Sequence, residues 1–283
     1  MKTPQLLWLK TLAYLTLVTF FSLSVLNSCT KDSSTNNRIA SLNTDDAAAN
    51  LSKGLVAWYS FENGSTKDKS GNGNDVIFNN ATSVADRHGV ANGAYSFNGT
   101  DNYMRVANSA SLNPGDAITL ATIVEVNGFY SGECHGNRIV NKGYNDDEYG
   151  SYHLGFSDNY FYQNTQCDKD VRVDKETFDG VLGNGLSSNV GTLDTTEYIQ
   201  TGEWYALAYT YDGNVAKFYV NGKLKYTKQQ TLSIGSNADD LFIGMMNIDD
   251  QLFPYWFNGV IDEIRIYNRA LTNAELKKLA DNY

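Results

Sequence analysis

Histidine, cysteine and proline are scarce in this chain, and their scarcity argues against a zinc site and against low-complexity disorder. The 283 residues include only three of each. With so few histidines and no Cys-x-x-Cys pair, a zinc site is a poor interpretation. The low proline content, beside 19 tyrosines and 24 glycines, argues against low-complexity disorder. It favours a twisted sheet protein with many tight turns.

Basic residues are also few. Lys and Arg total 22 against 32 Asp and Glu, which gives a formal net charge of −10. A surface of this sign repels phosphate backbones, so we expect no nucleic acid as a partner. The charge is compatible with neutral sugars and with divalent cations.

The motifs of several enzyme classes are missing from the sequence. It contains no Gly-x-Ser-x-Gly elbow, no His-Glu-x-x-His pair and no phosphate-binding loop. Three acidic residues, Asp146, Asp147 and Glu148, are crowded between Asn and Gly positions on a predicted turn. Solvation explains them better than catalysis does. We therefore expect no enzyme activity.

The N-terminus carries the one targeting signal. Lys2 and Lys10 accompany an apolar run from Thr11 to Leu26, which is short for a membrane-spanning helix and typical of a secretory leader. Leu26-Asn27-Ser28-Cys29 resembles a bacterial lipobox. We expect residues 1–28 to be a lipoprotein signal peptide and Cys29 to be the lipidated first residue of the mature protein. An ordinary buried cysteine is the alternative.

A polar segment follows the lipobox. Residues 29–53 are rich in Ser, Thr, Asn and Asp and predict a flexible tether. Lys31-Asp32 resembles the short charged signals of Bacteroidetes-type lipoproteins at the cell surface. The expected location is the outer membrane, reached through the lipid anchor, on the cell surface or facing the periplasm.

The expected location also indicates the state of the two remaining cysteines. Cys134 and Cys167 form an even pair in an oxidising compartment, which favours a disulfide. Two free thiols or a metal pair are the alternatives.

Strand-like runs dominate residues 54–267. The turns Asp212-Gly213-Asn214 and Asn221-Gly222 separate alternating runs and predict two hairpins. No long helical pattern occurs between residues 54 and 270, which excludes α/β architectures. The predicted strands are Leu55–Phe61, Asp75–Asn79, Ala94–Phe97, Tyr103–Val106, Ala117–Val126, Tyr152–Phe156, Trp204–Tyr211, Ala216–Val220, Leu224–Lys228, Leu241–Ile243 and Asn258–Ile266.

The C-terminal segment combines a strand with a short helix. β-Branched and aromatic residues between Val260 and Tyr267 favour a strand. Thr272 and Glu275 then have the spacing of a capping box. Leu271, Leu276 and Leu279 would form the apolar stripe of the helix, with Lys277 and Lys278 on its wet side.

Several segments, in this order, resemble the LamG-like jelly-roll domains of the concanavalin A-like lectin/glucanase superfamily. The matching stretches are 54–61 (GLVAWYSF), 68–74 (DKSGNGN), 94–103 (AYSFNGTDNY), 204–213 (WYALAYTYDG), 218–222 (FYVNG) and 257–271. The resemblance covers residues 54–283 and implies an all-β, two-sheet antiparallel sandwich whose first and last strands lie together. Catalytic members of the superfamily typically carry a Glu-x-Asp-x-x-Glu run, and this sequence has none: no third carboxylate follows Asp262-Glu263 at the required step, and Glu125 stands alone.

The resemblance also implies a structural calcium site. Related domains often hold one ion between an N-terminal turn and the acidic pair of the last strand. On that basis Asp68, Asn72 and Asp262 are the first candidate ligands, with Glu62 and Asp75 in reserve. The alternative is that Asp68 and Asn72 stabilise an Asx turn while Asp262 meets a backbone amide or Arg265.

Aromatic side chains on loops are the candidates for ligand binding, because sugar rings present flat C–H faces that stack on Trp and Tyr. We expect Trp256 first, since it follows Pro254 and Tyr255 just before the last strand, and then Tyr255, Tyr144, Tyr149 and Tyr130. The alternative is that most of these rings simply cover the sandwich.

Taken together, the sequence predicts a non-catalytic carbohydrate-binding module on an envelope lipoprotein, with a glycan or polysaccharide as partner. A protein-interaction or scaffold subunit that docks an outer-membrane protein is the first alternative. A glycoside hydrolase or lyase with unfamiliar catalytic residues is the second.

Overall fold

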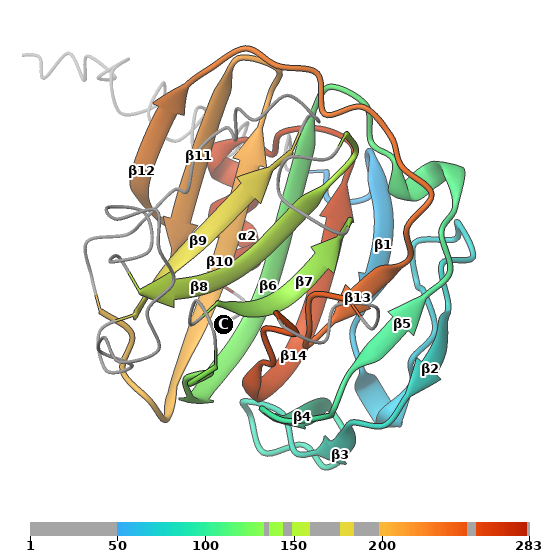
Figure 1. Cartoon of the computed structure of the whole chain (residues 1–283), viewed down its shortest axis with the longest axis vertical. Helices are drawn as coiled ribbons and strands as arrows, with labels where there is room; N and C mark the ends of the chain where they lie inside the picture. The colour runs from blue at the N-terminus through green and yellow to red at the C-terminus, as the bar shows by residue number, and fades with distance from the viewer. Residues whose placement is uncertain are drawn as a thin grey trace, which may run out of the picture. The chain divides into compact units, whose positions relative to one another are not determined.

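Two antiparallel sheets and a C-terminal helix, α2, make up most of the regular structure (Figure 1). The structure is a computed structural model that describes residues 50–132, 136–143, 149–158, 176–183, 198–247 and 253–281. All of these belong to one unit of the chain, residues 43–283. The predicted all-β sandwich with a short C-terminal helix is confirmed.

The larger sheet, sheet A, has eight strands, and the smaller one, sheet B, has six. In spatial order sheet A contains β12 (Lys223–Gln229), β11 (Val215–Val220), β10 (Glu203–Tyr211), β6 (Ile118–Gly128), β14 (Asn258–Tyr267), β4 (Ala94–Asn98) and β3 (Thr82–Val84), with β1 (Leu55–Tyr59) also on β14. Sheet B contains β2 (Val76–Asn79), β5 (Met104–Val106), β13 (Leu241–Ile243), β7 (Asn137–Lys142), β8 (Tyr152–Asp158) and β9 (Glu176–Leu182). Two 3-10 turns, Glu62–Gly64 and Ala110–Leu112, connect strands.

The first and last strands lie side by side, as predicted. Residues 264–267 of β14 pair with β1, and residues 258–261 pair with β4 on the same side. Asp262 sits between these two stretches, where a bulge also interrupts the pairing of β14 with β6. One strand therefore joins both ends of the domain and leaves a gap in the ladder at Asp262.

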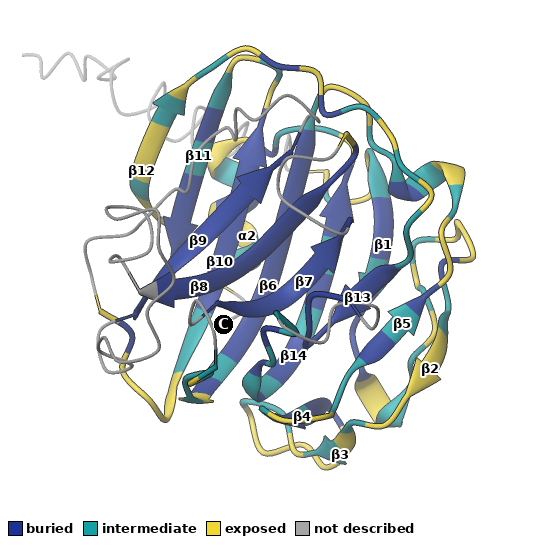
Figure 2. Cartoon of the chain, viewed as in Figure 1, coloured by how far each residue is buried: buried dark blue, intermediate teal, exposed yellow. Residues whose placement is uncertain are grey.

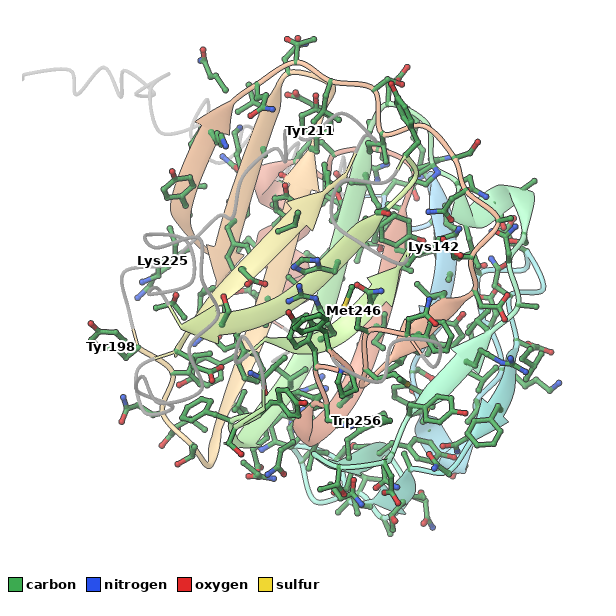
Figure 3. All side chains as sticks on the ribbon, viewed as in Figure 1. Lys142, Tyr198, Tyr211, Lys225, Met246 and Trp256 are labelled. Atoms are coloured by element: carbon green, nitrogen blue, oxygen red, sulfur yellow. The ribbon has the colours of Figure 1, made fainter. Side chains whose placement is uncertain are left out.

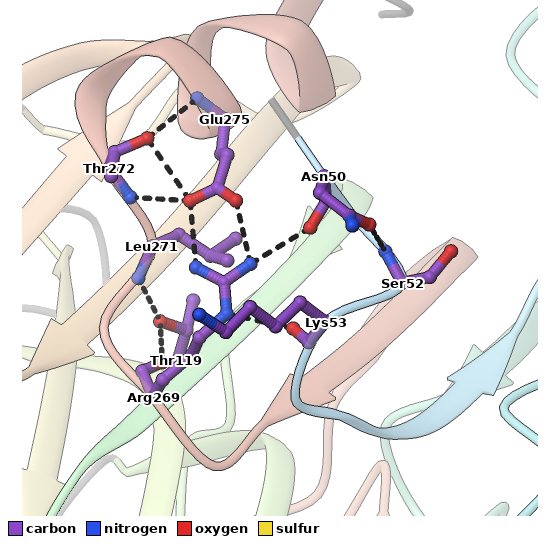
Figure 4. Close-up of polar contacts among 8 residues, drawn as sticks. All are labelled: Asn50, Ser52, Lys53, Thr119, Arg269, Leu271, Thr272 and Glu275. Carbon is purple, nitrogen blue, oxygen red and sulfur yellow. Dashed lines mark hydrogen bonds and ion pairs between the residues drawn. The ribbon is translucent and has the colours of Figure 1, made fainter. Parts of the chain in front are cut away.

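A clasp of polar contacts fixes the C-terminal helix, α2 (Asn273–Asp281), to the start of the described chain (Figure 4). The Arg269 guanidinium donates to both carboxylate oxygens of Glu275, at 2.6 and 2.8 Å, and to the carbonyls of Asn50 and Lys53. The predicted capping box is present, because the Thr272 amide donates to Glu275 Oε2 and the Glu275 amide donates to Thr272 Oγ1.

The main core lies between the sheets and is rich in aromatic rings, including Tyr59, Phe97, Phe156, Tyr209 and Phe218. A smaller cluster on the outer face of sheet A receives α2, which Figure 1 shows behind that sheet. Leu271 and Leu276 are buried there, and Leu279 packs against the cluster, as the predicted stripe requires. In the part of the chain that the structure describes, no helix is both long and apolar enough to cross a bilayer.

Both predicted hairpins form, β10 to β11 and β11 to β12. In the second, Asn221 and Gly222 adopt φ values of 50° and 70°, which is the left-handed backbone that a type I′ turn needs at both central positions.

Candidate functional site

One row of residues crosses the outer face of sheet B, and we call it the outer row. In register order it consists of Phe78, Arg105, Phe242, Asn141, His153 and Val181. Its strand neighbours Met104, Leu241 and Leu154 belong to the core between the sheets. Because side chains alternate along a strand, the row points away from that core.

Exposure falls from one end of the outer row to the other. Phe78 on the edge strand β2 is 38% exposed, whereas Asn141, His153 and Val181 are 1–3% exposed. Figure 2 shows the same contrast between exposed β2 and buried β7, β8 and β9. Phe242 on β13 is also only 3% exposed, so the accessible part of this face lies over β2 and β5.

Four aromatic side chains gather at that accessible end, and we call them the aromatic strip: Phe78, Tyr103, Phe242 and Trp256. Tyr103 is the centre. Its ring stacks on Phe78 at 4.6 Å and lies 6.2 Å from both Phe242 and Trp256. Trp256, which is half-buried, lies two residues before β14 (Figure 3). The sequence-predicted Trp256 thus joins three rings that come from other segments.

The turn that carries Tyr103 is held rigidly. Asn80 Oδ1 accepts from the Tyr103 amide at 2.8 Å, and Asn80 Nδ2 donates to the Asp101 carbonyl at 2.9 Å. Asn102 Nδ2 in turn donates to the Asn80 carbonyl at 3.0 Å. These bonds position the central ring of the strip before any ligand arrives, which lowers the ordering cost of binding.

Tyr255 and Tyr130 form a separate, packed cluster. Tyr255 is only 9% exposed and contacts Tyr130 edge-to-face at 6.2 Å. The Arg138 guanidinium lies 4.8 Å from the Tyr255 ring centre, and Met246 and Phe253 complete the cluster. The structure therefore brings these two predicted residues together, but with their rings against protein.

The other predicted aromatic residues lie elsewhere. Tyr149 is 45% exposed, and its ring covers Gly235 rather than any ring of the strip. Tyr144 lies outside the described residues.

A buried polar cluster occupies the far half of the sheet. Asp179 Oδ1 lies 3.2 Å from His153 Nε2, and Asp179 Oδ2 accepts from Ser157 Oγ at 2.8 Å. In a nucleophilic triad the histidine stands between the serine and the carboxylate. Here the aspartate stands between them, so the order differs from that of a nucleophilic triad.

The turn predicted to bind calcium is built around Asp68. Its Oδ1 accepts from the Trp58 and Ser70 amides, and its Oδ2 accepts from Ser70 Oγ and the Asn74 amide, all within 2.8–3.0 Å. An ionised carboxylate has about four lone-pair sites, and all four are used. Asn72 Nδ2 donates to the carbonyls of Leu55 and Val56.

The remaining candidate ligands have protein partners of their own. Asp75 accepts from Lys67 Nζ at 2.7 Å, and that hydrogen bond lowers the pKa of Asp75. Glu62 pairs with Lys69. Asp262 accepts from Arg87 at 2.6 Å; burial raises the pKa of Asp262, while Arg87 opposes the rise. The alternative interpretation named a backbone amide or Arg265 as its partner. The Arg87 amide does donate to Asp262 Oδ2, at 3.2 Å, and the side chain that pairs with Asp262 is that of Arg87 rather than Arg265.

The five candidate ligands do not form one coordination shell. Asp68, Asn72 and Asp75 share a turn, whereas Asp262 faces Arg87 at the gap in the ladder of β14. Within the described part of the chain, no three His, Cys, Asp or Glu side chains are grouped to hold a metal ion. As arranged, these residues do not fit calcium, and calcium binding stays a prediction. Cys29, Cys134 and Cys167 lie outside the described residues.

The comparison with protein families shows which family the domain belongs to. A model of the concanavalin A-like lectin/glucanases superfamily matches residues 98–277, more than half of the chain. The chain belongs to this superfamily. As a concanavalin A-like domain it has the fold that the sequence resemblance implied, and the matched range contains Tyr103, Arg105, Phe242 and Trp256. No curated protein matches the chain.

Solved structures share this concanavalin A-like fold at low identity. Domain 4 of AbnA, a GH43 extracellular arabinanase from Geobacillus stearothermophilus solved in complex with arabinotriose, is 22% identical with a TM-score of 0.54, covering 80% of this chain and 98% of that one. The binding domain of Paraclostridial Mosquitocidal Protein 1 is 16% identical with a TM-score of 0.59, covering 83% and 53%. The Botulinum Neurotoxin DC binding domain in complex with SialylT is 13% identical with a TM-score of 0.57, covering 82% and 52%. The chain thus spans about half the length of the toxin domains.

Sequence reasoning missed Phe78, Tyr103, Arg105 and Phe242 as site residues. Each lies in or beside a predicted strand, and the Tyr103-Met104-Arg105-Val106 alternation indicates one outward face. What the sequence alone does not show is that β2, β5 and β13 are neighbours. Phe78 and Phe242 both pair with Arg105 although they lie 164 positions apart in the chain (242 − 78), and no local signal encodes that pairing.

Proposed function

We propose that this protein is a non-catalytic carbohydrate-binding module that holds a glycan on the outer face of sheet B. The observation that carries the proposal is the aromatic strip. Phe78, Tyr103 and Trp256 are the accessible members, and Phe242 packs beneath them. The complexes of AbnA domain 4 with arabinotriose and of the neurotoxin domain with SialylT support the proposal by analogy of fold.

The strip has the chemistry that sugar recognition requires. Partly exposed rings offer apolar area to the C–H faces of a sugar, and the polar Asn80, Asp101 and Asn102 lie at its border for hydroxyl groups. An aromatic side chain has about 200 Å² of surface, so the 38% of Phe78 that is exposed is about 75 Å². Covering it contributes up to about 2 kcal/mol.

We further propose that no catalysis accompanies binding, and that a lipid on Cys29 holds the module on the outer membrane. The buried cluster of His153, Asp179 and Ser157 lacks the order of a nucleophilic triad. Docking of an envelope protein on the same strip is the competing proposal, because partly exposed aromatic rings also suit protein interfaces.

The experiment compares two variants of matched exposure on a glycan array. Phe78→Ala removes a strip residue that is 38% exposed on an edge strand of sheet B, and Tyr226→Ala removes a residue that is 39% exposed on β12, an edge strand of sheet A. We expect Phe78→Ala to weaken glycan binding at least tenfold and Tyr226→Ala to leave it unchanged. Trp256→Ala, checked for folding by circular dichroism, should behave like Phe78→Ala.

Three outcomes would contradict the proposal. Absence of any glycan binding, with co-purification of an outer-membrane protein, would favour the scaffold. Equal losses in Phe78→Ala and Tyr226→Ala would remove the strip from the site. Release of products from a polysaccharide panel would show an enzyme.

A further inference from the structure

An arginine stands in the middle of the aromatic strip. Arg105 on β5 is the Cα partner of Phe78 on one side and of Phe242 on the other. It lies two residues after Tyr103, so both side chains leave the same face of sheet B. A ligand that stacks on the strip must therefore pass close to a positive charge.

The guanidinium of Arg105 makes no hydrogen bond within the described part of the chain. Its nearest acidic atom is Asp240 Oδ2, 3.7 Å from Nε, which is too long for a hydrogen bond. Its Nε is buried without a partner. The contrast with Arg269 is large, because all three nitrogens of that guanidinium donate.

Asp240 is not arranged to satisfy Arg105 by itself. Its Oδ1 accepts from the Asn108 amide at 2.8 Å, which fixes the carboxylate at its present distance. The side chain of Arg105 is 35% exposed and that of Asp240 is 30% exposed, so a ligand can reach the pair. The site thus retains unused donors beside accessible aromatic rings.

From this arrangement we infer that the strip recognises acidic sugars, with the carboxylate of a uronic acid on Arg105 and the sugar ring on the aromatic side chains. The inference rests on the proposed glycan binding. A carboxylate suits the site because its two oxygens match the planar fork of a guanidinium, and such charge-assisted bonds are about twice as strong as neutral ones. A hydroxyl offers neither the charge nor the paired geometry.

The net charge of −10 does not oppose this inference at contact range. At physiological ionic strength the Debye length is about 8 Å, so distant carboxylates are screened from a bound ligand. The local balance near Arg105 decides the affinity, and Asp240 is the one acidic side chain that pairs with it in the described residues.

The test uses the full chain and paired probes. Oligomers of galacturonic, glucuronic and mannuronic acid are each compared with their methyl esters, which keep the ring faces and remove the charge. We expect at least one free acid to bind about 10- to 100-fold more tightly than its ester. Arg105→Gln should bring that ratio close to one because it weakens binding of the free acid far more than binding of the ester, and Arg105→Lys should keep only part of the preference.

Other variants separate this inference from the proposed function. Trp256→Ala and Phe78→Ala should weaken binding of acid and ester alike, and Tyr226→Ala should weaken neither. Equal affinity for acid and ester, an unchanged preference in Arg105→Gln, or binding of neutral or sulfated glycans alone would overturn the acidic-sugar inference and leave glycan binding standing. Absence of binding to every glycan would remove both.

Discussion

The polar clasp around Arg269 allows the effect of one substitution on the free energy of unfolding to be estimated. The guanidinium ties the carbonyls of Asn50 and Lys53, at the start of the described chain, to Glu275 in the C-terminal helix. The side chains of Arg269 and Glu275 are 21% and 5% exposed. Arg269→Ala therefore removes four hydrogen bonds and leaves Glu275 buried beside Thr272 alone.

Removing one partner of a buried ion pair costs about 3–5 kcal/mol. The cost here falls at the lower end, because the Thr272 amide and hydroxyl still donate to Glu275 and Arg269 is partly exposed. We expect Arg269→Ala to reduce the free energy of unfolding by about 3 kcal/mol at pH 7, out of a total of about 5–15 kcal/mol.

The effect depends on pH with a definite sign. Burial by itself would raise the pKa of Glu275, but hydrogen bonds from Arg269 and Thr272 outweigh it and lower the pKa. A lowered pKa in the folded state adds stability above the ordinary glutamate pKa, and that stability is lost as the pH falls through the folded value. Without Arg269, burial favours protonated Glu275. The cost of Arg269→Ala should therefore be smaller at about pH 3.5 than at pH 7.

The assay is urea denaturation of wild type and variant at both pH values. Lys277→Ala on the same helix is the matched control, since its pair with Asp281 is exposed and should contribute only about 0.3–0.5 kcal/mol. A cost below about 1 kcal/mol for Arg269→Ala, or one that grows as the pH falls, would refute this account of the clasp.

Three further predictions concern metal, cysteine pairing and anchoring. Because all four lone-pair sites of Asp68 are used, we expect EDTA to leave the melting temperature unchanged; a fall that added calcium reverses would instead support the predicted site. If Cys134 and Cys167 are paired as predicted, alkylation of the unfolded mature protein should modify neither residue before reduction and both after it, as mass spectrometry would show. Cys29→Ala should abolish incorporation of labelled fatty acid, and labelling that persists in this variant would remove the anchor from Cys29.

Local chemistry explains which parts of the fold could be predicted. The capping box depends on two residues three apart, and the Asn221-Gly222 turn depends on backbone conformations that these residues adopt easily. Such features need no knowledge of the rest of the molecule. The pairing of β1 with β14 is long-range, and the family resemblance supplied it where periodicity could not.

The sequence was less informative about the candidate site, because the orientation of a side chain depends on distant parts of the chain. Trp256 was identifiable because a Trp two residues after a loop proline has few structural explanations, yet its neighbour Tyr255 packs in a cluster with Tyr130. Both residues precede β14, and Tyr255 has a left-handed backbone with a φ of 48°, so no strand alternation tells from the sequence which of the two faces the strip. Asp262 shows the same limit, since Arg87 reaches it from a distant loop through a gap between β4 and β1.

The edge strands of the two sheets are protected differently, and the difference bears on function. Unpaired edges invite association with other chains, and charged side chains, lysine above all, are the usual protection. Edge strand β12 of sheet A carries lysines at 223, 225 and 228. Edge strand β2 of sheet B, with the sequence VIFN, carries no charge and exposes Ile77 by 55% and Phe78 by 38%. Both edge strands expose apolar side chains, since Leu224 and Tyr226 of β12 are 52% and 39% exposed, but only β12 places lysines beside them. Strand β2 therefore retains a liability for association. Contact of β2 with the proposed glycan would explain why the liability persists, and the stacked pair of Phe78 and Tyr103 is where such contact would begin.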